Sequence, residues 1–261
     1  MNELILKEDG KYKVYEELLL KRDQLNKDAR TIYAIYLKEF GELLLESFEL
    51  KIECIKKKKM ITYCQAALNR GESIDVQKMN NKIDTSMALY NLQLKEMAAK
   101  KEIADKAKTV PAYQAEKAKR IYKRLAKMLH PDINPNVAGN EELCDLWDRI
   151  YVAYNCNDDE ELDNLEILVR KVLKDDGEAI GNVEIDNLEE RISKLEYEIN
   201  NILTTEPYIY SDLLSSEDKV IARKEELNNE IAEFKKYSAE LSEVLQIILS
   251  GGGATLTWIQ D

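Results

Sequence analysis

Glycine, proline and phenylalanine are scarce in this sequence. Its 261 residues include 9 glycines, 4 prolines and 3 phenylalanines, whereas 34% of the residues are charged. Proteins built from sheets need more turn residues and more β-branched residues than this. The composition therefore favours long helices and coiled coils, and the length allows about two or three small domains, or one domain with long helical extensions.

Groups that carry enzymatic or metal chemistry are scarce as well. The chain has one histidine, His130, and four cysteines, which lack the close-paired spacing of zinc sites. A catalytic Ser-His-Asp or Cys-His site would have to use His130, and the glycine run at 251–253 lacks the following lysine of a phosphate-binding loop. We therefore expect no enzymatic activity, no catalytic residue, no metal and no cofactor.

The sequence also lacks an apolar run of membrane-spanning length and a basic, apolar leader at its start. We therefore expect a cytoplasmic protein with reduced cysteines and no membrane contact. The formal net charge of −12 argues against general nucleic-acid binding, which needs basic side chains to neutralise phosphates. A basic patch in so acidic a chain would be a distinctive feature.

Apolar residues at helical spacing divide the chain into long segments. One runs from about residue 12 to 69, and a second runs from about 73, where Ser73 can cap it, to 108. Gly71 breaks the chain between them, so residues 1–108 are predicted to form an antiparallel hairpin. Pro111 can start the next helix, which ends at Leu129. Further helices are predicted over about 140–155 and 159–174, which makes residues 109–176 a central domain.

Heptad-like spacing returns beyond a linker at residues 175–177. Two helical segments with a break at Pro207 predict a second hairpin, an antiparallel coiled coil, over residues 177–250. Residues 251–261 are predicted to be a tail, hinged on glycines, with a strand-like composition at its tip. The predicted fold class is therefore all-α, with a central domain flanked by long antiparallel helical hairpins.

The helix before His130 has two opposed faces. Spacings of three and four residues place an apolar set on one face and a basic set nearly opposite. The apolar set is Ala118, Tyr122, Leu125 and Leu129, and the basic set is Lys117, Arg120, Arg124 and Lys127. Residues 108–129 contain seven basic side chains and one acidic side chain, a net charge of +6. One face is therefore suited to packing and the other is a local basic strip.

The helix after His130 repeats the apolar spacing at Leu143, Trp147, Ile150 and Tyr154. Two helices with matching stripes and a loop between them should form an antiparallel pair. We therefore expect the loop at residues 130–132 to project His130 and Asp132 from one end of the pair. Pro131 should stiffen the loop because its ring fixes one dihedral angle and blocks continuation of the helix.

This pattern resembles the J-domain family. Residues 122–135 read YKRLAKMLHPDINP, which is similar to the family's tyrosine, two basic residues, Leu-Ala, His-Pro-Asp and Asn-Pro. Trp147, Ile150 and the Ala153-Tyr154 pair follow in the family's register. The family also opens with a short aromatic helix and a Leu-Gly pair, which residues 103–108 lack. Either the end of the first hairpin replaces that helix in the core, or the domain is incomplete.

The resemblance implies a co-chaperone. Its basic helix would dock on an acidic surface of a DnaK-type ATPase domain, and its His-Pro-Asp loop would trigger ATP hydrolysis there. The flanking hairpins would target clients, a scaffold or a second copy of the chain. The alternative is a non-enzymatic coiled-coil scaffold or dimerisation protein with a vestigial J domain. The partner-binding residues that the resemblance implies are Lys117, Arg120, Lys123, Arg124, Lys127, His130, Pro131, Asp132 and Asn134.

Overall fold

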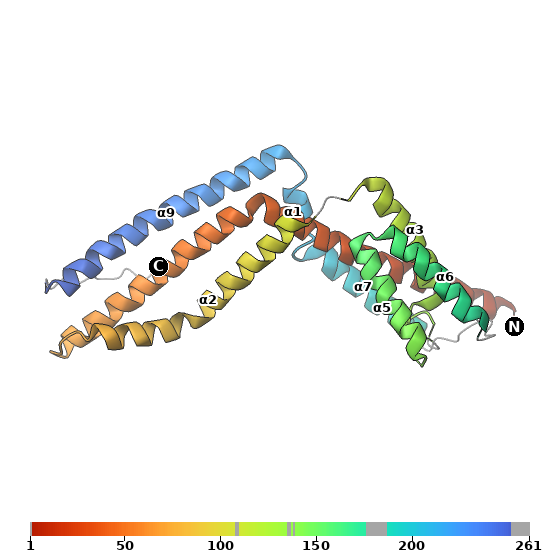
Figure 1. The fold of residues 1–261 in the computed structure, drawn as a ribbon, viewed down its shortest axis with the longest axis horizontal. Coiled ribbons are helices and arrows are strands. Elements are labelled where there is room, and N and C mark those ends of the chain that lie inside the picture. Colours follow the sequence, from red (N-terminus) through yellow and green to blue (C-terminus); the bar gives the residue numbers. More distant parts are fainter. Residues whose placement is uncertain (1, 108–109, 135–136, 138, 176–186, 252–261) are drawn as a thin grey trace. The chain divides into compact units, whose positions relative to one another are not determined.

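The computed structural model describes residues 2–107, 110–134, 137, 139–175 and 187–251 (Figure 1). These residues form helices and contain no strand, which confirms the predicted all-α class. The helices are α1 (Asn2–Asn69), α2 (Val76–Lys106), α3 (Ala112–Leu129), α5 (Glu141–Cys156), α6 (Asp159–Asp175), α7 (Leu188–Thr204), α8 (Tyr210–Leu213) and α9 (Glu217–Leu249). Within the described ranges, none of them combines the length and the apolar character that crossing a membrane requires.

The chain divides into two compact units. Unit 1 comprises Met1–Thr31 and Lys108–Ile209, and unit 2 comprises Ile32–Ala107 and Tyr210–Asp261. The uninterrupted helix α1 therefore contributes its first part to unit 1 and the remainder to unit 2. This division differs from the predicted one, in which residues 1–108 form a single arm.

Unit 1 is built on α3, α5 and α6. Their apolar stripes meet in one core, which Leu20 of α1 joins. The rings of Tyr122 and Tyr154 stack there with centroids 3.9 Å apart. A smaller cluster brings Tyr15 and Leu19 of α1 together with Ile133 and with Leu195 of α7. The first part of α1 therefore covers residues that lie more than a hundred positions further along the chain.

Local capping sets the directions of these helices. The side chain of Asn140 accepts a hydrogen bond from the Leu143 amide at the start of α5. Asn157 ends α5 in the left-handed conformation, with φ of 54°. The side chain of Asp158 then accepts from the Glu161 amide at 2.9 Å. This short turn places α6 directly after α5, so that both pack on α3.

Unit 2 contains the later part of α1 together with α2 and α9. Gly71 adopts a φ of +70° in the turn between α1 and α2. Asp75, not the predicted Ser73, caps α2 by accepting from the Lys78 amide. Cys64 and Met79 lie on either side of this turn, with their sulfur atoms 3.5 Å apart. Residues 32–106 thus fold back as a hairpin.

Helices α7 and α9, which were predicted to form one C-terminal hairpin, belong to different compact units. Leu195 of α7 belongs to the small cluster in unit 1. Leu241 and Ile248 of α9 instead pack with Ile52 and Ile61 of α1. The apolar stripes of α7 and α9 thus pack against different helices, and heptad spacing alone does not specify the partner of a stripe. Residues 176–186 and 252–261, which include two of the three residues of the predicted linker and nearly all of the tail, lie outside the described part.

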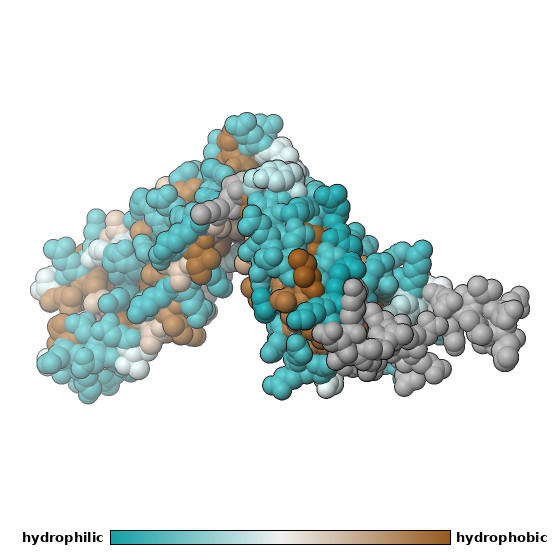
Figure 2. Space-filling view, turned by 45° about the vertical axis from the view of Figure 1, so that its right-hand side comes forward, coloured by the Kyte–Doolittle hydropathy of each residue, from teal (hydrophilic) through white to brown (hydrophobic). Residues whose placement is uncertain are grey.

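Most charged residues of the described ranges are exposed or partly exposed. Figure 2 shows a face that is mostly hydrophilic, with smaller hydrophobic groups between the hydrophilic residues. This is the distribution expected of helices that bury one stripe and leave the opposite side in water.

Candidate functional site

The residues after α3 form a tight turn. The His130 amide donates to the Ala126 carbonyl oxygen at 2.8 Å, which completes the last turn of the helix. The amides of Ile133 and Asn134 then both donate to the His130 carbonyl oxygen. Pro131 follows immediately and prevents the helix from continuing. The His-Pro-Asp tripeptide is therefore held in one backbone arrangement at the end of α3.

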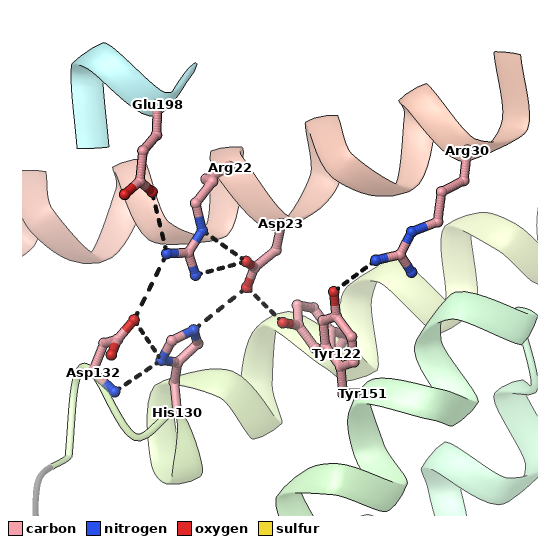
Figure 3. Close-up of polar contacts among 8 residues, drawn as sticks. All are labelled: Arg22, Asp23, Arg30, Tyr122, His130, Asp132, Tyr151 and Glu198. Atoms are coloured by element: carbon pink, nitrogen blue, oxygen red, sulfur yellow. Dashed lines mark hydrogen bonds and ion pairs between the residues drawn. The ribbon is translucent and has the colours of Figure 1, made fainter. Parts of the chain in front are cut away.

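His130 is buried rather than projected, with 5% of its surface exposed. Its Nδ1 accepts a hydrogen bond from the Asp132 amide at 3.1 Å, so in the neutral ring the proton belongs on Nε2. Nε2 faces Asp23 Oδ2 at 3.5 Å (Figure 3), and the ring lies 4.8 Å from that of Trp147. The predicted exposure of His130 is wrong because α1 covers the ring and supplies a carboxylate partner for it.

Asp23 is the centre of this polar network. Its Oδ2 accepts a hydrogen bond from the Tyr122 hydroxyl at 2.7 Å. Its Oδ1 accepts from Nε and Nη2 of Arg22 at 3.2 and 3.0 Å. Burial by itself raises the pKa of Asp23, but the contacts with His130, Tyr122 and Arg22 outweigh it and hold the pKa below its ordinary value. Asp23 is therefore a buried carboxylate that stays ionised.

Arg22 connects three elements. Its Nη1 lies 3.8 Å from Oδ2 of Asp132 in the loop and 3.7 Å from Oε2 of Glu198 in α7. Burial lowers the pKa of Arg22, but the neighbouring carboxylates outweigh burial and raise it above its ordinary value. Figure 3 shows the guanidinium between these carboxylates and Asp23. Arg22 thus restrains Asp132, whose side chain is 47% exposed.

Helix α1 is also fastened to α5. Lys27 is buried, and its Nζ donates to the Tyr154 carbonyl oxygen at 2.7 Å and to Asn157 Oδ1 at 2.6 Å. Burial lowers the pKa of Lys27 to about 8. Further along, Arg30 Nη2 donates to the Tyr151 hydroxyl at 3.0 Å. These bonds fix the position of α1 along α5, and with it the position of Asp23.

Three residues of the predicted basic strip form ion pairs within unit 1. Their partners are acidic residues of α6 and α1, most of them largely covered. Lys117 Nζ lies 2.8 Å from Asp159 and 2.7 Å from Asp163, Arg124 Nη2 lies 2.6 Å from Glu166, and Lys127 Nζ lies 2.6 Å from Glu16. The Arg124 contact holds the pKa of Glu166 at about 2. Much of the strip's charge is therefore neutralised, because acidic residues of α6 at positions 159, 163 and 166 face α3.

Among the cations of α3 that were predicted to bind a partner, Arg120 and Lys123 stay open. Both are exposed, and neither forms an ion pair with any residue that the structure describes. Asn134, which was predicted to contact a partner, is buried instead. Its Nδ2 donates to the Met128 carbonyl oxygen, and its Oδ1 has no hydrogen-bond partner in the described part of the chain. The accessible predicted residues are thus Pro131, Asp132 and the outer cations of α3.

Sequence reasoning missed Arg22 and Asp23, which lie more than a hundred residues before the loop. One signal was present. Tyr15, Leu19, Asp23 and Lys27 are spaced by four residues and therefore share one face of α1. An acid and a lysine that continue an apolar stripe indicate a buried polar contact, although the spacing does not identify the partner.

The network leaves His130 without a free basic nitrogen, since Nδ1 accepts from the Asp132 amide and Nε2 faces Asp23. The described residues contain no group of three or more metal-ligating side chains placed to hold a metal ion. Comparison of the sequence with protein-family models finds no match, and comparisons with curated proteins and with solved structures find none either. The observations that bear on function are therefore the restrained loop and the open cations of α3.

Proposed function

We propose that α3 and residues 130–132 dock on the ATPase domain of a DnaK-type chaperone and stimulate its ATP hydrolysis. The chain would then act as a J-domain co-chaperone, with its other helices directing it to clients or partners. The observation that carries this proposal is the rigid His-Pro-Asp turn at the end of a helix with open basic residues. The chain itself would perform no chemistry.

Helix α1 supports the proposal because it would take the place of the family's missing opening helix. Leu20 enters the core that α3, α5 and α6 share. The alternative candidate, the end of α2, belongs to unit 2, where Ala104 packs with Tyr36 and Phe40. A J-like core would thus be completed by a segment from the start of the chain, and not by residues 103–108.

Arg120 and Lys123 would provide most of the docking charge. Lys117 and Arg124 already pair with Asp159 and Glu166, whose side chains are 11% and 12% exposed. A partner that drew Lys117 away would leave the covered Asp159 without its counter-ion. One that drew Arg124 away would leave the covered Glu166 with Arg170 alone, and both losses are costly. Arg120 and Lys123 involve no such cost, so they can attract an acidic surface and orient it.

The proposal is tested by single-turnover ATP hydrolysis in the cognate DnaK-type protein. The intact chain should accelerate hydrolysis, and His130→Gln should abolish most of the acceleration. An intact chain without effect, or equal acceleration by both proteins, would show that the co-chaperone function is wrong.

Matched charge variants locate the docking surface. Arg120→Ala combined with Lys123→Ala should weaken docking roughly tenfold at low salt, because steering depends on local charge. Lys171→Ala, which removes an exposed cation from α6 in the same unit, serves as the control. Equal weakening by Lys171→Ala would mean that overall charge, and not α3, is responsible.

The second candidate is a coiled-coil scaffold or dimerisation protein with a vestigial J-like module. The burial of His130 and the internal pairing of Lys117, Arg124 and Lys127 favour it. It predicts no acceleration by the intact chain, together with self-association or partner binding that survives His130→Gln. Light scattering of the intact chain and of His130→Gln measures the self-association directly.

A further inference from the structure

Every buried aspartate, lysine or histidine side chain within the described ranges lies in unit 1, and one of them, Asp23, contacts the loop histidine. The set comprises Asp23, Lys27, His130 and Asp159. Asp159 pairs with Lys117 and holds α6 on α3, while Lys27 holds α1 on α5. Asp23 differs from both because its partners include the ring of His130. Its position in the fold therefore bears on the loop itself.

The orientation of the His130 ring and the backbone of the loop depend on each other. The Asp132 amide needs an unprotonated Nδ1 as its acceptor, at 3.1 Å. The proton must then reside on Nε2, which is buried and needs an acceptor of its own. Asp23 Oδ2, at 3.5 Å, is the acceptor that the structure places there. Without it, the Nε2 proton would be a buried donor with no partner.

We propose that Asp23 is a positioning residue for the His-Pro-Asp loop. It holds the His130 ring in the Nε2–H tautomer, and that tautomer holds the Asp132 amide. The same carboxylate accepts from Nη2 of Arg22 and so orients the guanidinium, whose Nη1 lies beside the Asp132 side chain. Asp23 thereby controls how the Asp132 side chain, which is 47% exposed, is presented. The effect on the tautomer is independent of the proposed function, and only its consequence for ATP hydrolysis rests on that function.

The variant Tyr122→Phe distinguishes a positioning role of Asp23 from a merely structural role. The Tyr122 hydroxyl donates to the same oxygen of Asp23 at 2.7 Å, but no contact joins it to the His130 ring in Figure 3. Tyr122→Phe removes one donor and leaves the acceptor for Nε2 in place. It should destabilise unit 1 without changing the tautomer, whereas Asp23→Ala should change the tautomer.

His130 is the only histidine of the chain, so the imidazole region of a ¹⁵N–¹H correlation spectrum reports on this ring alone. The wild-type chain, at a pH where the ring is neutral, should show the Nε2–H pattern. Asp23→Ala should lose this pattern. Either the Nδ1–H tautomer becomes populated, or exchange between the two tautomers averages the signals of the two nitrogens. Asp23→Asn, which keeps an acceptor oxygen, should largely restore the Nε2–H pattern. Tyr122→Phe and the same-helix control Asp28→Asn should leave it unchanged.

A retained Nε2–H pattern in Asp23→Ala would overturn the proposal. If Asp23→Ala does not fold, the Asp23→Asn spectrum decides, because exchanging a charged acceptor for a neutral one must move the Nε2–H resonance. An unchanged resonance in Asp23→Asn would then overturn the proposal.

The functional consequence is a change in maximal rate and not in docking affinity. Arg120 and Lys123 are untouched in Asp23→Ala, so the dissociation constant for the DnaK-type protein should stay the same. The maximal stimulated rate should fall severalfold and recover in Asp23→Asn. A loss confined to affinity would contradict the positioning role. If the wild-type chain stimulates no hydrolysis, the proposed function fails, while the tautomer measurement still tests Asp23.

Discussion

Unit 1 and unit 2 bury different kinds of side chain. The described core of unit 2 consists of residues such as Ile61, Cys64 and Met79, and its buried polar residues are two serines, Ser47 and Ser238. Unit 1 buries two aspartates, a lysine, a histidine and an asparagine. Burying a charge is costly unless it is paired and hydrogen-bonded, so packing alone does not favour such residues. Within the described ranges, the contrast therefore places the buried polar network in unit 1.

The ion pairs of the two units differ in the same way. In unit 2, Glu39 and Glu46 are 42% and 43% exposed where they pair with Lys224 and Lys235. In unit 1, Glu166 is 12% exposed beside Arg124. Exposed pairs contribute little because water screens them and long side chains lose entropy. Partly covered ion pairs therefore add to the apolar packing of α6 on α3 in unit 1, whereas the exposed pairs of unit 2 contribute little to its apolar packing.

The largest expected effects come from the two apolar cores. Leu125 in unit 1 and Ile61 in unit 2 are fully buried. Replacing either with alanine should lower the free energy of unfolding by about 2–5 kcal/mol, since lost contacts and a cavity add together. In calorimetry, Leu125→Ala should lower the transition of unit 1, and Ile61→Ala that of unit 2. Equal shifts of a single transition by both variants would show that the units unfold as one.

Substitutions that remove one polar atom should distinguish the units more sharply. Tyr122→Phe removes a donor to a buried carboxylate and should cost about 1.5–3 kcal/mol. Ser238→Ala in unit 2 removes an acceptor of Lys57, whose Nζ also bonds the Ser238 carbonyl oxygen. Its cost should be about 0.5–1.5 kcal/mol. Urea unfolding of both variants measures the difference, and equal costs would remove the distinction between the two interiors.

The sequence was sufficient for the helices but not for their partners. Spacing located α3 and the start and end of α5 to within a residue or two, because an apolar stripe and its caps are local features. It did not show that α7 and α9 pack in different units. Two stripes of similar width are compatible with either arrangement, and the choice depends on contacts between segments far apart in the sequence.

The local features of the candidate site were predicted from the sequence, but its contacts with distant segments were not. The His-Pro-Asp turn and the open cations Arg120 and Lys123 follow from residues that are neighbours in the sequence. The burial of His130 does not, because it depends on Asp23 in a distant helix. Lys117 and Arg124 were assigned to a partner, although acidic residues of α6 hold them. A basic strip in one helix does not reveal which acidic residues of the chain will face it.

Acid should destabilise unit 1 through Glu166. Its hydrogen bond to Arg124 outweighs burial and lowers its pKa from 4.5 to about 2. A carboxylate with a lowered pKa in the folded state stabilises that state above its unfolded pKa, and the contribution is lost as pH falls from 4.5 towards 2. Unfolding in urea at several pH values should show this loss, and Glu166→Gln should flatten it. In unit 2, Glu53→Gln should change the slope less, because Glu53 is 50% exposed.

The smallest effect is expected from an exposed ion pair in unit 2. Lys235 pairs with Glu46, and both side chains are largely open to water. Lys235→Ala should change the free energy of unfolding by less than about 0.5 kcal/mol. Lys127→Ala in unit 1 should cost more, because it leaves Glu16, which is 15% exposed, without its counter-ion. Added salt should reduce the Lys235 effect to nothing and preserve part of the Lys127 effect, since screening acts mainly on exposed charges. Equal costs for the two variants would mean that carboxylate burial does not distinguish the ion pairs of the two units.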